Sequence, residues 1–106
     1  MGLIRAIKSG WHEGKGHKCR RKEDFRGALE RYILALNNSE NEGGKPVLME
    51  YIAKSHISLC EYAEALNYAQ ESYDLYKKQE NISPIFKDGL KRMAKLIEKI
   101  KEQKET

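Results

Sequence analysis

The sequence has few of the residues that cross-link a chain or interrupt helices. Among its 106 residues are two cysteines, Cys19 and Cys60, and two prolines, Pro46 and Pro84. Two cysteines on separate predicted helices argue against a disulfide framework and favour a reducing compartment. So few prolines leave long stretches free to form helix.

Long apolar runs are also missing. Leu3, Ile4 and Ile7 make the beginning of the chain mildly apolar, but Arg5 and Lys8 interrupt it before a leader peptide or a membrane span can form. We therefore expect a cytoplasmic protein without a membrane segment. With 40% hydrophobic and 34% charged residues, the composition favours a soluble all-α domain with one core.

The charge is unevenly distributed along the chain. Residues 1–22 contain seven Lys and Arg against one Glu, and residues 83–106 contain seven against four acids. Residues 23–82 contain eleven acids against six Lys and Arg. Two interpretations stay open: the basic ends attract an acidic partner, or these charges are solvated helix faces.

Apolar periodicity and helix-terminal residues predict five helices. Pro46 suits the first turn of the third helix, and Ser83 with Pro84 suits the beginning of the fifth. The polar, glycine-bearing stretch from Asn37 to Gly44 predicts a loop. The expected helices cover about Leu3–Arg21, Phe25–Asn37, Pro46–Leu59, Glu61–Gln79 and residues 83–102.

A short pattern occurs twice, with an offset of 37 residues. It consists of a small residue, then an aromatic residue, then Ala three positions later, followed by Leu. The matching pairs are Gly16 with Ala53, Phe25 with Tyr62, Ala28 with Ala65, and Leu29 with Leu66. Such a pattern is typical of two antiparallel helices in close contact, because the small residues let the backbones approach.

This pattern, over about residues 9–79, resembles the tetratricopeptide repeat, a helix-turn-helix unit of about 34 residues. The resemblance implies a single all-α domain over residues 1–102, built from antiparallel hairpins in an α–α superhelix. This domain comprises repeat 1 at about 9–42, repeat 2 at about 46–79 and a capping helix at about 83–102. Residues 103–106, outside the domain, are expected to form a disordered tail. The centre of packing is expected at Phe25, Ala28, Tyr32, Ala53, Tyr62, Ala65 and Ala69.

The first repeat departs from the family pattern. His12 and Lys15 stand where the family has Trp and Leu, and Trp11, one position earlier, is expected to supply the missing bulk. A small residue such as Gly16 is expected at this position, because the two helices of the repeat cross there.

The resemblance also implies a binding face. Family ligands lie along the first helices of the repeats, and the corresponding positions here are Glu13, His17, Arg20, Arg21, Glu50, Tyr51, Lys54 and Ser58. Arg20, Arg21 and Lys54 can pair with carboxylates, which suits an acidic or carboxyl-terminal peptide. Glu13, His17 and Tyr51 replace the Lys and Asn residues of the family's carboxylate clamp, so the clamp for chaperone tails is not expected. Ordinary exposed helix surface remains the alternative for all eight positions.

Patterns typical of catalysis or cofactor binding are absent from the sequence. Gly14-Lys15-Gly16 lacks the spacing of a phosphate-binding loop. His17, Cys19, His56 and Cys60 are metal-ligand types, but their spacing matches no zinc motif, so we expect no metal and no cofactor. The six tyrosines lie in the acidic middle of the chain, which disfavours nucleic-acid binding.

The sequence therefore predicts a non-catalytic module that binds a peptide or helix of another protein. Two alternatives stay open: a small regulator or inhibitor that covers an acidic protein partner, and a self-assembling structural subunit. A homodimer is a further expectation, because repeat arrays usually need about three repeats. The identity of the partner, the pathway, the oligomeric state and the binding face are not encoded in these patterns.

Overall fold

The computed structural model describes residues 2–105, with the side chains of residues 3–104, and over that range it is helical without strands. The prediction of an all-α fold with about five helices is confirmed. The helices are α1 (Gly2–Arg21), α2 (Phe25–Asn38), α3 (Lys45–Ser58), α4 (Tyr62–Lys78) and α5 (Pro84–Glu105). Of residues 103–106, predicted as a disordered tail, residues 103–105 belong to α5, which ends at Glu105, and residue 106 lies outside the described residues.

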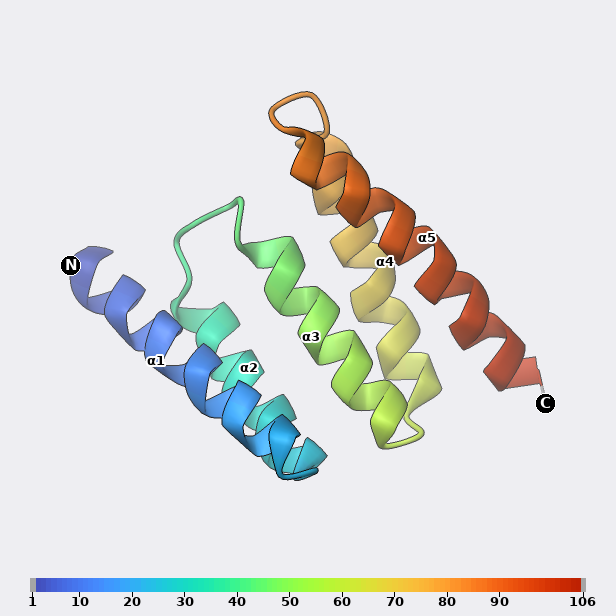
Figure 1. Ribbon diagram of the computed structural model, residues 1–106, viewed down its shortest axis with the longest axis horizontal. Coiled ribbons are helices and arrows are strands. Elements are labelled where there is room, and N and C mark those ends of the chain that lie inside the picture. The colour runs from blue at the N-terminus through green and yellow to red at the C-terminus, as the bar shows by residue number, and fades with distance from the viewer. Residues whose placement is uncertain (1, 106) are drawn as a thin grey trace.

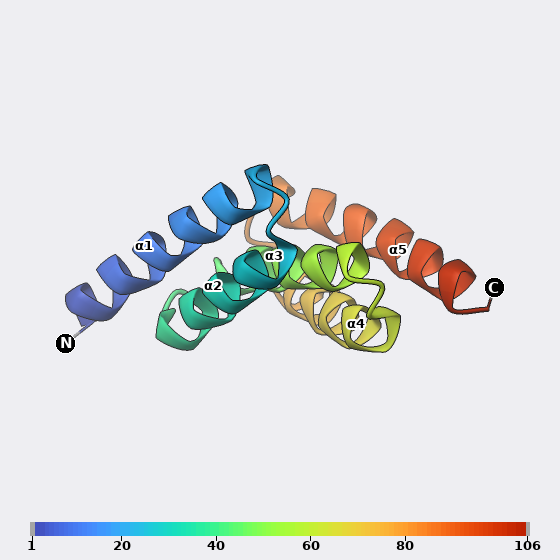
Figure 2. The ribbon, with the colours of Figure 1, turned by 90° about the horizontal axis from the view of Figure 1, so that it is seen from below.

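Each helix packs against its neighbours in the chain (Figure 1). Seen from below, α1, α3 and α5 lie on one side of the molecule and α2 and α4 on the other (Figure 2). Helices α3 and α5 also contact each other directly. The result is a thin molecule of 45 × 35 × 18 Å, in which α3 occupies the middle.

The turns of the α1–α2 and α3–α4 hairpins have the same backbone geometry. Glu23 and Cys60, 37 residues apart, have left-handed φ angles of 61° and 60°. The Asp24 N–H then donates to the Cys19 carbonyl at 2.9 Å, and the equivalent bond of the second turn is 2.8 Å. This hydrogen bond across six residues is the Schellman ending of a helix. The internal repeat found in the sequence is therefore also present in the backbone geometry of the two turns.

The core lies between the helices of each hairpin and their neighbours. Of the residues predicted at the centre of packing, Phe25 and Tyr62 are only partly buried. The others have no exposed surface: Ala28, Tyr32, Ala53, Ala65 and Ala69. A Cβ added at Gly16 would lie 2.7 Å from the Tyr32 ring. A small residue is therefore required at this crossing, as the sequence predicts.

The apolar side of α1 does not face the core. Trp11 is 54% exposed, and Leu3, Ile4 and Ile7 are exposed as well, so Trp11 does not supply the missing bulk of the first repeat. The side that faces α2 carries small and polar residues instead, and the Ser9 hydroxyl donates to the Ala35 carbonyl at 2.7 Å.

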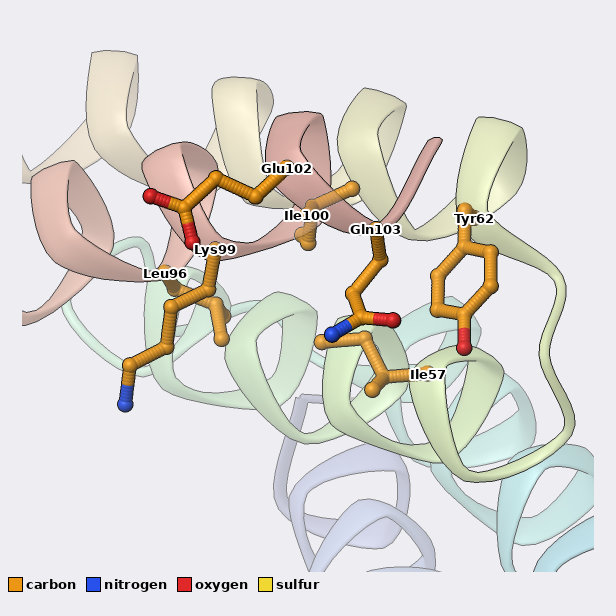
Figure 3. Close-up of a pocket in the computed structure, with 7 residues that line it drawn as sticks. All are labelled: Ile57, Tyr62, Leu96, Lys99, Ile100, Glu102 and Gln103. Atoms are coloured by element: carbon orange, nitrogen blue, oxygen red, sulfur yellow. The ribbon is translucent and has the colours of Figure 1, made fainter. Parts of the chain in front are cut away.

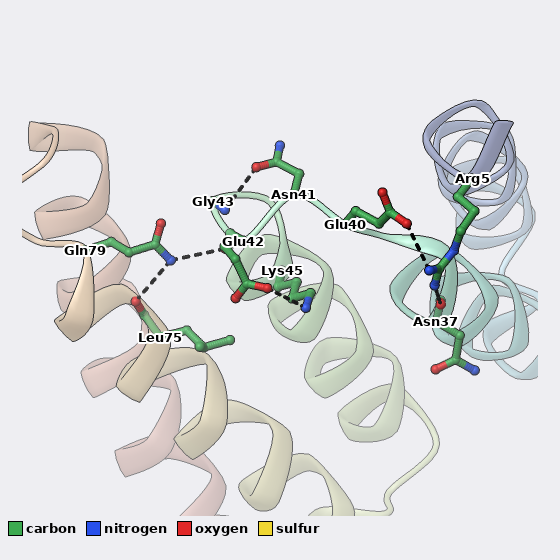
Figure 4. A network of polar contacts seen from close by, with 9 residues as sticks. All are labelled: Arg5, Asn37, Glu40, Asn41, Glu42, Gly43, Lys45, Leu75 and Gln79. Atoms are coloured by element: carbon green, nitrogen blue, oxygen red, sulfur yellow. Dashed lines mark hydrogen bonds and ion pairs between the residues drawn. The ribbon is translucent and has the colours of Figure 1, made fainter. Parts of the chain in front are cut away.

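The loop between α2 and α3 is attached on both sides (Figure 4). Arg5 donates to the Glu40 carboxylate and to the Asn37 carbonyl, both at 2.9 Å. On the other side, the Gln79 amide donates to the Glu42 carbonyl at 3.1 Å. These contacts link α1 and α4 to the loop. Because the Arg5–Glu40 pair is exposed to solvent, it contributes little to stability.

Candidate functional site

Four of the predicted site residues form an aromatic cluster between α1 and α3. His17 Nδ1 lies 2.7 Å from the Tyr32 hydroxyl, and the His17 ring meets the Tyr51 ring edge-on at 4.8 Å. Tyr51 stacks on Tyr32 at 5.2 Å, and the Arg20 guanidinium lies 5.5 Å from the centre of the Tyr51 ring. Glu13 completes the cluster, 3.3 Å from His17 Nε2. The cluster fixes these side chains before any ligand arrives, and Arg20 remains exposed.

Glu50 was predicted on the exposed binding face, and the structure corrects this, since Glu50 is only 4% exposed. Arg92 donates to both of its carboxylate oxygens at 3.1 Å, and Lys54 Nζ lies 3.1 Å from Oε2. The Tyr76 hydroxyl also donates to Glu50, at 3.1 Å. Burial raises the pKa of Glu50, but the hydrogen bonds from Arg92 and Lys54 outweigh it and hold that pKa below its usual range. Glu50 therefore joins α3 to α4 and α5.

Arg21 and Ser58 belong to neither group. Both are exposed at the last residues of their helices, α1 and α3. Within the described residues, neither side chain has a hydrogen bond or an ion pair. Of the predicted site residues with a positive charge, Arg20 and Lys54 are exposed and held in place by neighbours.

Two adjoining depressions lie between α3 and α5, and we call them together the α3–α5 groove. One has a volume of about 230 Å³ and is lined by Glu50, Lys54, Arg92, Met93, Lys95, Leu96 and Lys99. The other has a volume of about 500 Å³ and is lined by Ile57, Tyr62, Leu96, Lys99, Ile100, Glu102 and Gln103 (Figure 3). Leu96 and Lys99 line both, so the two depressions adjoin.

The two parts of the α3–α5 groove differ in character. The first part has four cations, Lys54, Arg92, Lys95 and Lys99, against the single carboxylate of Glu50. Neither Lys95 nor Lys99 has a carboxylate within ion-pair distance in the part of the chain that the structure describes. The second part is mainly apolar, with Ile57, Tyr62, Leu96 and Ile100 in its walls (Figure 3). The groove thus presents apolar surface beside four cations and the two carboxylates of Glu50 and Glu102, and two of the cations, Lys95 and Lys99, are in no ion pair with a described residue.

The α5 side of this groove was missed in the sequence, where its lysines were interpreted as a solvated face. A signal was present, because Arg92, Leu96 and Lys99 are spaced by four and three residues and so share one helix face. The direction in which that face points depends on how α5 is rotated against α3. The sequence alone does not fix that rotation.

The other candidate ligands are engaged in structural contacts. His56 Nδ1 lies 2.9 Å from a Glu61 carboxylate oxygen, and its ring stacks on Tyr68 at 5.7 Å. Cys19 and Cys60 are free thiols. Among residues 2–105, no group of three or more His, Cys, Asp or Glu side chains is arranged to hold a metal ion. Over the same range, no helix is both long enough and apolar enough to cross a membrane.

Comparison with known proteins adds no relative. No protein-family model matches the chain, and comparisons with curated proteins and with solved structures found no match.

Proposed function

We propose that the chain is a non-catalytic interaction module of the tetratricopeptide-repeat kind, which binds an acidic peptide of another protein in the α3–α5 groove. The observation that carries the proposal is the pair of unpaired lysines, Lys95 and Lys99, beside an apolar depression. Carboxylates on a ligand would compensate this charge, and apolar side chains would fill the depression. The proposal includes a cytoplasmic location, which is supported by the free, exposed thiol of Cys60.

Arg92 and Lys54 play a different part from Lys95 and Lys99. Glu50 already pairs with both of them, and its hydrogen bond raises the pKa of Arg92 further. They form a fixed wall of the groove, while the two lysines are free to turn toward a ligand. Arg20, held over Tyr51, extends the positive surface toward α1. An acidic peptide can therefore contact α3 and α5 and continue across Tyr51.

Selection from a random peptide library tests this proposal. Peptides of about 12 residues span roughly 40 Å when extended, which is close to the 45 Å length of the molecule. We expect selected peptides to combine Asp and Glu with large apolar residues. The Lys95→Glu/Lys99→Glu variant should bind them about tenfold or more weakly, and binding should weaken steeply with salt. Fluorescence anisotropy of labelled peptides measures both effects.

Lys87→Glu/Lys101→Glu is the matched control, because it makes the same double charge change on α5 at exposed positions outside the groove. It should lower affinity by about twofold or less, through long-range charge alone. Selected peptides without acidic residues would contradict the proposal. Equal losses in the Lys95→Glu/Lys99→Glu and Lys87→Glu/Lys101→Glu variants would show that net charge, and not the groove, governs binding.

A further inference from the structure

Large apolar residues spaced by three and four positions form an exposed strip along one side of α1. Its large residues are exposed: Leu3 by 74%, Ile4 by 61%, Ile7 by 63% and Trp11 by 54%. Gly10 and Gly14 lie on the same side, because Gly10 follows Ile7 by one turn and Gly14 follows Gly10 by one turn. We call the strip formed by these residues the α1 outer face. Single exposed apolar residues are ordinary, but a contiguous strip marks an interaction surface.

The glycines of α1 distinguish this face from an apolar surface without a specific shape. A Cβ at Gly16 would collide with Tyr32, which explains that glycine within the chain. A Cβ at Gly10 or Gly14 would meet nothing within 4 Å. Glycine is less favourable than Ala in a helix interior, and packing inside the chain does not offset this cost at Gly10 or Gly14. Two glycines one turn apart leave a shallow notch in which the backbone of a second helix can approach closely.

The surroundings of the α1 outer face are basic. Two cations lie over the Trp11 ring, with Lys15 Nζ 5.3 Å and Arg31 Cζ 5.2 Å from its centre. Lys8 and Lys18 lie along the same helix, and within the described residues neither has a carboxylate at ion-pair distance. Residues 1–22 carry seven Lys and Arg against one Glu, so two copies packed through α1 would repel each other. The charge therefore selects a negatively charged partner.

We propose that the α1 outer face binds an amphipathic helix of another protein, whose apolar stripe is flanked by Asp and Glu. The apolar stripe covers Ile7 and Trp11, the close approach occurs at Gly10 and Gly14, and the acids pair with the lysines along α1. An anionic lipid surface would also meet the charge, but it gains nothing from the notch. The α1 outer face shares no residue with the α3–α5 groove, which is lined by α3, α4 and α5 (Figure 1).

A designed pair of peptides tests this proposal on the full chain. The probe is a helical peptide of about 20 residues, the length of α1, with a leucine stripe flanked by glutamates; its twin has lysines in place of the glutamates. Trp11 is the single tryptophan, so its emission reports binding at this face. We expect the emission to shift to shorter wavelength with the glutamate peptide, which should bind about tenfold or more tightly than the twin.

Two variants distinguish specific docking at this face from non-specific apolar binding. Gly14→Leu fills the notch with a better helix former and should weaken binding about tenfold while α1 becomes more stable. Ile7→Glu should abolish binding, whereas Ile85→Glu, at an equally exposed isoleucine on α5 (67%), should leave it unchanged.

Three results would overturn the proposal. The first is equal binding of the two peptides, or no binding of either. The second is a dimer of the chain itself, seen by light scattering and lost in Ile7→Glu. The third is a Trp11 shift with phosphatidylserine vesicles that survives Gly14→Leu, which would assign the face to a lipid surface.

Discussion

Tyr76 combines close packing with a buried polar contact. Its ring has no exposed surface and lies so near α5 that a Cβ at Gly89 would come within 2.5 Å of it. Its hydroxyl donates to Glu50 at 3.1 Å and lies 3.3 Å from Arg92 Nη2, which donates to it. A glycine is therefore required opposite the ring, and the hydroxyl completes the contacts of the buried Glu50 carboxylate.

Stability at alkaline pH should depend on Tyr76. Burial, followed by the charge of Glu50, raises the pKa of Tyr76 from 10.0 to about 12. Because the raised pKa favours the neutral phenol in the folded state, this contribution is fully present below pH 10 and is lost as the pH rises toward 12. Tyr76→Phe should lower the free energy of unfolding at neutral pH by about 1 kcal/mol and remove this alkaline component. Urea unfolding across the pH range measures both.

Tyr73→Phe is the control for this experiment. The Tyr73 hydroxyl has no hydrogen-bond partner among the described side chains and backbone groups. Its removal should leave the alkaline decline as in the original chain. If Tyr76→Phe declined as steeply as Tyr73→Phe, the titration of Tyr76 would not be coupled to folding.

The ends of α1 and α3 carry residues that do not suit their conformation. Glu23 and Cys60 occupy the left-handed position that glycine usually takes. A side chain there costs roughly 1–2 kcal/mol. Glu23 is exposed and has no ion pair within residues 2–105. Glu23→Gly should therefore raise the free energy of unfolding by about 1 kcal/mol, as measured by chemical denaturation.

The same substitution within a helix should have the opposite effect. Glu30 is exposed in the interior of α2, where glycine costs about 1 kcal/mol. Glu30→Gly should therefore be destabilising. A loss of stability in both variants would mean that the left-handed turn at Glu23 does not form in solution.

The helices could be predicted because their signals are local. The Asp24 side chain accepts the Gly27 N–H at 2.9 Å, and Pro46 and Pro84 stand in the first turns of α3 and α5. The rotation of α1 could not be predicted by the same rules. Apolar residues usually indicate the buried side of a helix, but α1 buries Gly16 and leaves Ile7 exposed.

The candidate site could be predicted only in part, because contacts between distant helices decide which of its residues are buried. Arg20 and Lys54 are exposed, as expected from their positions in α1 and α3. Glu50 occupies the position in α3 equivalent to Glu13 in α1, yet Arg92 and Tyr76 enclose it. No local pattern specifies which residues of α3 are enclosed by a helix more than thirty positions later in the chain.

The molecule as a whole depends on contacts between successive helices. Two core clusters lie side by side, one around Tyr32 and Ile52 and the other around Ala53 and Ala65. Ile100 of α5 belongs to the second cluster, so α5 is an integral part of the core. Because Ile52 and Ala53 are consecutive residues of α3, this helix joins the two clusters. A change that separates α3 from α4 should therefore affect the complete domain.

Ala65→Trp tests this dependence. Ala65 has no exposed surface and packs in the same cluster as Ala53 of the facing helix, so a tryptophan would force α3 and α4 apart. Overpacking typically costs about 1–3 kcal/mol, and more where backbones are in close contact. Against a total stability of about 5–15 kcal/mol for ordinary domains, and less for a small one, we expect loss of cooperative folding. Lys101→Trp, at an exposed position of α5, should melt like the original chain when followed by circular dichroism. A cooperative, near-original melt of Ala65→Trp would contradict the close packing of α3 and α4, and with it the repeat assignment.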